Sequence, residues 1–219
     1  MTDWSTLWPV YLSSIGQTLW MVVVTLVLGG ILGLALGVLL YTTRTGGLLA
    51  NRGLSTVLNV VVNLVRPIPF IIFMTAIAPL TQLTLGTFLG TPAAIFPMTI
   101  AATFGISRIV EQNLVTIDPG VIEAARAMGS SPWRIIMTLL IPEALGPLIL
   151  GYTFVFVSIV DLSAVAGSLG GGGLGDFAIQ YGYQRYNWVV TWVAVLTIVV
   201  LVQLAQFLGN SLARKALRR

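Results

Sequence analysis

The 219-residue sequence contains no cysteine, no histidine and a single lysine, and only 8% of its residues are charged. Without cysteine the chain forms no disulfide and offers no thiolate to a metal. Without histidine it lacks the commonest metal ligand and the side chain that exchanges protons near neutral pH. An ordinary soluble domain carries about 25% charged residues. The low charge, together with 57% hydrophobic residues and a mean hydropathy of +0.96, therefore excludes that class.

Nucleotide-binding motifs are also missing. No G-x-x-x-x-G-K-[ST] phosphate loop is present, and the lysine, Lys215, lies near the C-terminus. Gly170, Gly172 and Gly175 match the dinucleotide pattern G-x-G-x-x-G, but that pattern is meaningful only between a strand and a helix. Here it follows an apolar helix, so we expect a compact outer loop or re-entrant turn instead. We predict no cofactor, no metal site and no enzymatic activity in this chain.

Long uncharged runs dominate what remains. Residues 4–43, 67–107 and 186–213 carry no formal charge, and each exceeds the roughly 20 residues needed to cross a bilayer. We predict an all-α polytopic membrane protein with one transmembrane domain over 14–208, between an extracytoplasmic segment 1–13 and a basic cytoplasmic tail 209–219. The uncharged loop "TQLTLGTFLGTP" (81–92) separates the second span from the third. The five predicted spans lie near residues 16–41, 55–79, 92–110, 144–166 and 188–210.

The basic residues predict the orientation of these spans, because cytoplasmic loops collect Lys and Arg. Five spans leave Arg185 alone on one side and place the other basic loop residues, with the four of the tail, on the opposite side. The N-terminus is then outside and the C-terminus cytoplasmic. Four tryptophans fall near the predicted outer interface: Trp4, Trp8, Trp188 and Trp192. This bias accounts for the pI of about 9.9, and no nucleic-acid partner is indicated.

The first span carries Gly29, Gly33 and Gly37 at every fourth position. Small residues on one helical face let two helices approach closely in lipid. We interpret these glycines as packing positions; a moving helix interface is the alternative.

The second span places Asn59, Asn63 and Arg66 on one helical face, directly before Pro67 and Pro69. The prolines remove backbone donors and should bend or break the helix. Polar residues at membrane depth usually face a bundle interior or a water-filled cavity. This face is a candidate translocation pathway; an interhelical hydrogen-bond network, or an arginine reaching the interface, would explain it equally.

The fourth span adds Ser158 and Asp161, three residues apart on one face. Asp161 is a candidate to bind a substrate ammonium or to pair with Arg66. It would also be accounted for by water at the end of the span.

The segment "IEAARAMGSSPWRII" places a small, polar, helical element between the third and fourth spans. Asp118 and Pro119 are a helix-start signal, Gly129 suits a left-handed C-terminal cap, and Ser131 with Pro132 repeats the start signal. We expect Pro142 to interrupt the second helix just before the fourth span. The result is a helix–glycine–helix bracket on the cytoplasmic face.

Side chains along this bracket suit insertion into a groove of another protein. Three alanines keep its flank thin: Ala124, Ala125 and Ala127. Glu123, Arg126, Met128 and Trp133 are expected to project from it. An amphipathic helix lying on the membrane surface is the alternative.

The string "EAARAMGSSPWRIIMTLLIPEAL" resembles the EAA loop of permease subunits of bacterial ABC importers, whose signature is EAA, three residues, Gly, nine residues and I-x-L-P. Glu123, Ala124, Ala125, Gly129 and Pro142 fall in register. The usual Ile and Leu are replaced conservatively, by Leu139 and Ile141. The strings "GVLLYTTR", "VRPIPFII", "LIPEAL" and "GGGLGDFAIQYGYQRYN" extend the resemblance over nearly the whole chain, and together look most like the five-helix methionine importer permeases.

This resemblance implies a homodimeric pore in the bacterial inner membrane. Two cytoplasmic ATPase subunits would use ATP and Mg²⁺, and an extracytoplasmic solute-binding lipoprotein would deliver the substrate. The helix containing Glu123 would be the coupling helix, seated in a groove of the ATPase. Val165, where some relatives are expected to carry Met, and Asp161 depart from the family pattern.

Two alternatives remain open at this stage. The same architecture would serve another polar amino acid or a small amine, with Asp161 binding the cation. A self-contained secondary transporter or channel would show inverted repeats, and we find no convincing internal repeat.

Overall fold

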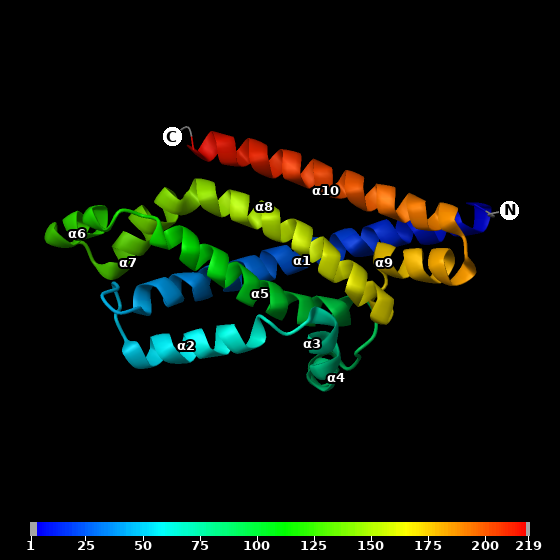
Figure 1. Cartoon of the computed structure of the whole chain (residues 1–219), viewed down its shortest axis with the longest axis horizontal. Helices are drawn as coiled ribbons and strands as arrows, with labels where there is room; N and C mark the ends of the chain where they lie inside the picture. Colours follow the sequence, from blue (N-terminus) through cyan, green and yellow to red (C-terminus); the bar gives the residue numbers. More distant parts are fainter. Residues whose placement is uncertain (1–3, 218–219) are drawn as a thin grey trace.

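The computed structural model describes residues 4–217, which form helices connected by short turns, with no strand in that range. Four helices in it are long and apolar enough to cross a membrane: α1 (Trp4–Thr43), α5 (Thr91–Val115), the helix Pro132–Gly171 and α10 (Trp188–Leu217). They lie along one common axis (Figure 1). The beginning of α1 and the end of α10 lie at opposite ends of this bundle (Figure 1).

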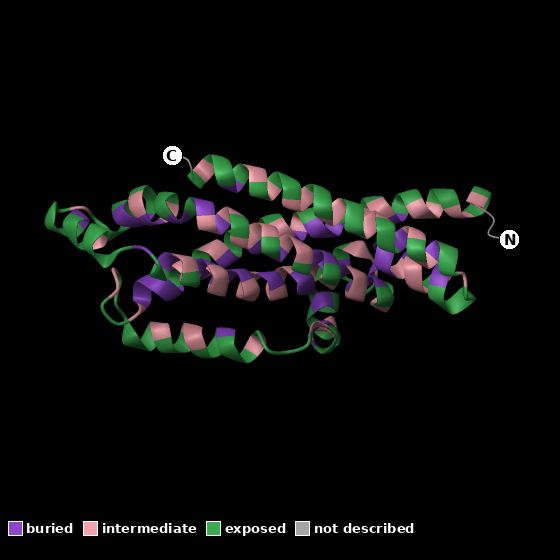
Figure 2. Ribbon diagram, turned by 45° about the horizontal axis from the view of Figure 1, so that its top comes forward, coloured by how far each residue is buried: buried purple, intermediate pink, exposed green. Residues whose placement is uncertain are grey.

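The second predicted span is broken. Helix α2 (Arg52–Val65) and helix α3 (Phe70–Ala76) meet at 105° across the segment that holds Pro67 and Pro69. The predicted bend is confirmed, and its cause is the missing backbone donors of the prolines. Counted as one span, the bent pair brings the number of candidate spans in residues 4–217 to five. Only Val62 of α2 is buried, so this helix lies on the outside of the bundle (Figure 2).

The prediction of a loop over residues 81–92 is wrong for its first five residues. Residues Ala78–Leu85 form helix α4, with Pro79 in the first turn. Gly86 ends the helix in the left-handed conformation (φ +74°), and its carbonyl accepts a hydrogen bond from the Gln82 side chain at 2.8 Å. Proline near a helix start and glycine just beyond its end are ordinary helix boundary signals, which the lack of charge in this stretch obscured.

Helices continue through the boundaries that the sequence predicts for the membrane domain. Helix α1 begins at Trp4 and runs unbroken past residue 14, and α10 continues past residue 208 to Leu217. Residues 1–3 and 218–219 of the predicted terminal segments lie outside the described part of the chain.

The predicted interruption at Pro142 is also wrong. Helix α7 (Pro132–Ile135) continues through a π-helical turn, Ile136–Leu140 (η1), into α8 (Ile141–Ala166), so these segments form one continuous helix up to Ala166. A π-turn shifts the hydrogen bonds of the preceding residues by one position. We infer that this shift absorbs the donor that Pro142 lacks, so that the helix stays continuous.

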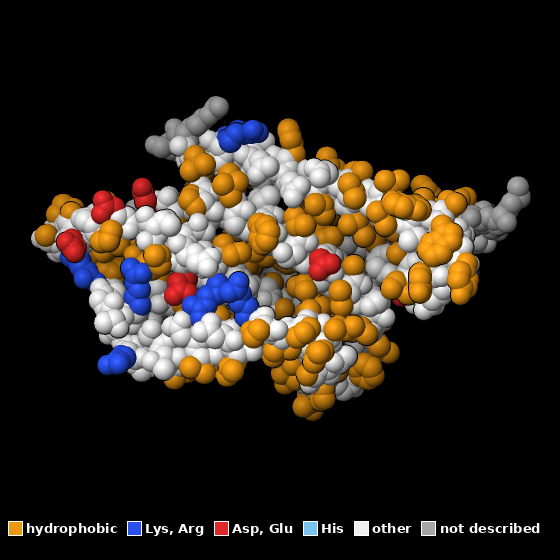
Figure 3. Space-filling view, viewed as in Figure 1, with side chains coloured by type: hydrophobic (Ala, Val, Ile, Leu, Met, Phe, Trp, Pro, Cys, Tyr) orange, Lys and Arg blue, Asp and Glu red, His pale blue; other side chains and the backbone are white. Residues whose placement is uncertain are grey.

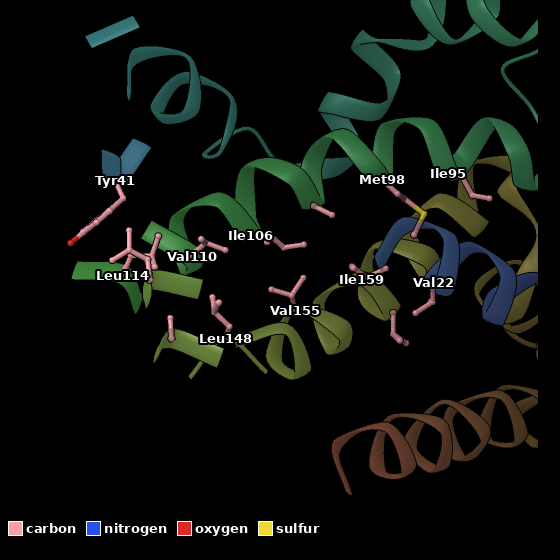
Figure 4. Close-up of a cluster of buried hydrophobic side chains, with 14 of the residues drawn as sticks. Val22, Tyr41, Ile95, Met98, Ile106, Val110, Leu114, Leu148, Val155 and Ile159 are labelled. Carbon is pink, nitrogen blue, oxygen red and sulfur yellow. The ribbon is translucent and has the colours of Figure 1, made fainter. Parts of the chain in front are cut away.

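The core of the bundle is formed where α1 packs along α5, with α8 beside them. A methyl group added at Gly29, Gly33 or Gly37 would come within 2.9, 2.6 and 2.5 Å of an α5 side-chain carbon. The three α5 residues concerned are Ala102, Ile106 and Val110. These glycines therefore lie at the closest approach of the two helices, and buried aliphatic side chains extend along the seam (Figure 4).

The glycine-rich segment folds back on the bundle as a short helical re-entrant turn. It comprises a π-helical turn (η2, Gly167–Gly171), α9 (Gly173–Phe177), a second π-turn (η3, Ala178–Gly182) and a 3₁₀ turn (η4, Tyr183–Arg185). The Gly173 N–H donates to the Gln17 side chain at 2.7 Å, and the Leu174 N–H donates to the Thr18 hydroxyl at 2.8 Å. These α1 side chains hold the turn at the end where α1 and α10 begin (Figure 1).

Candidate functional site

A bracket of two short helices projects from the end of the bundle opposite the N-terminus (Figure 1). It comprises α6 (Pro119–Ala127) and α7, and we call residues 118–135 the bracket. Both predicted N-caps form. The Asp118 carboxylate accepts the Gly120 N–H at 2.8 Å, and the Ser131 hydroxyl accepts the Arg134 N–H at 3.4 Å.

Gly129 ends α6 in the left-handed conformation, with φ +76°. Its N–H donates to the Arg126 carbonyl at 2.9 Å, and the Ser130 N–H donates to the Ala125 carbonyl at 3.1 Å. This pair of bonds is the Schellman C-cap. The two helices of the bracket are therefore joined by a fully hydrogen-bonded turn with a defined geometry.

The bracket presents a mixed surface to its surroundings. The Met128 side chain is 78% exposed and that of Trp133 is 70% exposed. Glu123, Ala124 and Ala127 are exposed too, whereas Ala125 packs inward. Hydrophobic and acidic side chains gather together at this end of the molecule (Figure 3).

Arg126 is exposed, and its side chain reaches across to a neighbouring loop. Its Nη2 atom donates to the Gly47 carbonyl at 2.9 Å, in the loop between α1 and α2. Tyr41 and Arg44 lie in the same region, where they form a cation–π contact with the Arg44 carbon 4.1 Å from the ring centre. Arg126 thus ties the bracket to the chain that leads into the broken span.

Asn59 and Asn63 contact an arginine of α5. The Nη2 atom of Arg108 donates to the side-chain oxygen of Asn59 at 2.9 Å and to that of Asn63 at 2.8 Å. The Nη1 atom of Arg108 forms an ion pair with Glu111. We call these four residues the polar clasp. The clasp holds α2 against α5, which is the interhelical network that the sequence left open as an alternative to a pathway.

The sequence does not predict a functional role for Arg108, because its charge contributes there only to the predicted orientation of the spans. The sequence signal for it is the spacing of Arg108 and Glu111, which are three residues apart on one helical face. Their side chains are 13% and 19% exposed.

The remaining pathway candidates lie apart from the clasp. Arg66, Ser158 and Asp161 are exposed, and among the described residues the ion pair of Arg108 is the only one. Arg66 and Asp161 therefore do not pair. Arg66 lines a pocket of about 280 Å³ at the bend between α2 and α3, together with Phe70 and Phe73.

The fold and this site define a class: a polytopic α-helical membrane protein that presents a rigid, capped helix pair at one end. Residues 33–218 match the family described as binding-protein-dependent transport system inner membrane component. The chain belongs to this family, and it is accordingly an inner-membrane protein.

Individual relatives agree over most of the chain. It is 45% identical to the "Probable D-methionine transport system permease protein MetI" of Vibrio cholerae, over 93% of this chain and 91% of that protein. It is 39% identical to the "Methionine import system permease protein MetP" of Bacillus subtilis, over 78% of each. A solved structure of inward-facing conformations of the MetNI methionine ABC transporter has 40% identity and a TM-score of 0.95, covering 98% of this chain and 99% of the other.

Proposed function

We propose that this chain is the membrane-spanning permease subunit of an ATP-driven importer of methionine, and that the bracket transmits the motion of a separate ATPase to the membrane helices. The observation that carries the proposal is the exposed, doubly capped bracket. The names of the relatives support methionine as the substrate and an ABC importer as the transporter class.

The orientation that we propose places the bracket in the cytoplasm. The bracket, the α1–α2 loop and the end of α10 lie at one end of the bundle (Figure 1). Most basic residues belong to these segments, among them Arg44, Arg52, Arg134 and Lys215. The positive-inside rule assigns that end to the cytoplasm and the N-terminus to the outside.

In this proposal two copies of the chain form the pore, and two cytoplasmic ATPase subunits bind ATP and Mg²⁺. An extracytoplasmic binding protein delivers the substrate. A push on the bracket has two routes into the membrane. One is the continuous helix formed by α7, η1 and α8, which runs from the bracket toward the opposite end of the bundle. The other is the hydrogen bond of Arg126 to the α1–α2 loop.

Both routes depend on stiffness. The Schellman cap at Gly129 fixes α6 relative to α7, so a displacement of one helix moves the other. The polar clasp then fixes α2 to α5, so that these two helices move together. We therefore assign Asn59 and Asn63 a positioning role, and we propose Arg66, Ser158 and Asp161 as residues of the pathway itself. Exposed polar residues at membrane depth usually face water or a partner helix.

Reversal of the charge at Glu123 tests the coupling role. Glu123→Lys should reduce methionine uptake, and should either loosen the association with the ATPase or let the ATPase turn over without transport. Gln184→Lys likewise introduces a lysine, on the exposed turn at the opposite end of the bundle, and should leave uptake and assembly unchanged. Normal co-purification together with normal uptake in Glu123→Lys would contradict the proposal.

Substrate competition distinguishes the alternatives. If the pore serves another polar amino acid or a small amine through Asp161, that compound and not methionine will be taken up by the reconstituted complex. A secondary transporter would move substrate without an ATPase or ATP.

A further inference from the structure

An apolar groove lies between α1, α8 and α10, away from the bracket and the polar clasp. Its volume is about 650 Å³, and its walls include Val27 and Ile31 of α1, Leu145 and Phe156 of α8, and Leu208 and Leu212 of α10. Several of these side chains are about half exposed, so the groove opens outward.

Water has few hydrogen-bond partners in this groove. Tyr152 and Thr153 are the polar side chains that line it, and both donate to backbone carbonyls. The Tyr152 hydroxyl donates to the Gly30 carbonyl of α1 at 2.7 Å, and the Thr153 hydroxyl donates to the Ile149 carbonyl at 2.8 Å. The groove therefore suits a hydrocarbon chain, because an apolar occupant displaces no water that is well hydrogen-bonded to the protein.

The shape of the groove is held by contacts between its walls. The Tyr152 hydrogen bond ties α8 to α1 at the floor. Gly209 packs directly against Thr153, which brings α10 close to α8. Leu217 packs in the same way against Gly146, so the last turn of α10 is held beside α8.

One end of the groove is basic. Leu212 and Ile141 line that end, and Arg214 and Lys215 follow Leu212 in the last turn of α10. The nearby acidic residue in the sequence of α8 is Glu143, in its first turn. The positive charge thus exceeds the negative charge where a lipid headgroup would lie.

From this juxtaposition we propose that the groove is a binding site for an anionic phospholipid. One acyl chain lies between α1, α8 and α10, and the phosphate headgroup lies against Arg214 and Lys215. Basic residues next to a membrane span attract anionic lipids. A lipid is the proposed occupant because the groove is apolar along its length and positively charged at one end. The proposal concerns a surface outside the coupling and pathway residues, and it does not depend on which substrate the importer carries.

Native mass spectrometry of the full-length protein, with the subunits that co-purify, tests the proposal by titration with phosphatidylglycerol and with phosphatidylethanolamine. Leu208→Trp fills the groove and should reduce bound phosphatidylglycerol at least fivefold. The matched control is Leu196→Trp, on the same helix and similarly exposed but outside the groove, which should retain it. Leu145→Trp fills the groove from α8 and should repeat the result of Leu208→Trp.

The headgroup is tested by charge. Arg214→Gln and Lys215→Gln should each weaken phosphatidylglycerol binding by about fivefold, the effect of one cation near an anionic surface, and should leave phosphatidylethanolamine binding unchanged. Arg52→Gln removes a cation from α2 and should change neither lipid. Unchanged phosphatidylglycerol binding in both Trp variants would overturn the proposal. Equal loss of both lipids in the charge variants would also overturn it. A Trp variant that changes the number of associated copies but not the bound lipid would overturn it too, and would assign the groove to a second copy of the chain.

Discussion

Removal of the arginine at the centre of the polar clasp should release α2 from the bundle. Arg108→Met keeps a side chain of similar length but loses the guanidinium, and with it the hydrogen bonds to Asn59 and Asn63 and the ion pair with Glu111. Helix α2 has little else to hold it, because Val62 is its one buried residue.

The expected cost follows from these contacts. Hydrogen bonds between membrane helices average about 0.6 kcal/mol and reach about 1.7 kcal/mol, so the two asparagine contacts contribute about 1–3 kcal/mol. Glu111, which is 19% exposed, is left without its partner, which adds roughly 1–3 kcal/mol. We expect Arg108→Met to destabilise the attachment of α2 by about 2–6 kcal/mol.

Hydrogen exchange measured by mass spectrometry over residues 52–65 reports this attachment directly. A factor of ten in the exchange rate corresponds to about 1.4 kcal/mol, so exchange in α2 should accelerate at least 20-fold while exchange in α5 changes little. Asn59→Leu should accelerate exchange in the wild type but add little in the Arg108→Met background, because both changes remove the same contact. Replacing Glu111 with Gln should partly rescue Arg108→Met.

Two results would refute this reasoning. Exchange in α2 that is the same in Arg108→Met and the wild type would mean that the helix is held by other contacts. Additive effects of Asn59→Leu and Arg108→Met would mean that the two residues do not interact.

Three further predictions concern single positions. Gly33→Ala should destabilise the protein by roughly 1–3 kcal/mol through overpacking, because the new methyl comes within 2.6 Å of an Ile106 carbon; Gly16→Ala, which meets nothing within 4 Å, should be neutral or stabilising in the same thermal unfolding experiment. Gly129→Val should lower the free energy of unfolding by about 1–2 kcal/mol because of the positive φ at this position, and it should reduce the coupling of ATP hydrolysis to uptake. Gly129→Asn should retain coupling. Equal activity of the two variants would argue against a conformational role. Asp161→Asn should change the KM for uptake while Asp161→Glu changes it less, and unchanged kinetics in both would leave Asp161 as a residue that merely faces water.

Local signals predicted the bracket well because its structure is determined by nearby residues. The caps at Asp118, Ser131 and Gly129 each join atoms within five residues of one another. The helix break at Pro67 and Pro69 is local for the same reason. The prediction from sequence failed where one local signal is compatible with more than one backbone structure. Pro142 ends a helix in isolation, but here a π-turn keeps the helix continuous.

The partners of polar side chains were beyond prediction from the sequence. Asn59 meets Arg108 across 49 residues, Arg126 meets Gly47 across 79 residues, and Gln17 meets Gly173 across 156 residues. No periodicity within one helix records such pairs, since each depends on how two helices are rotated about their axes.

The sequence by itself therefore determined the class of protein, the approximate spans and the capped bracket, because hydrophobicity, charge distribution and helix caps act over short stretches of chain. The tertiary structure decided what those elements touch. It joined Arg126 to the loop between α1 and α2, brought Asn59 and Asn63 together with Arg108 in a clasp, and formed the groove between α1, α8 and α10. Each of these depends on the relative placement of separate helices, which only packing in three dimensions defines.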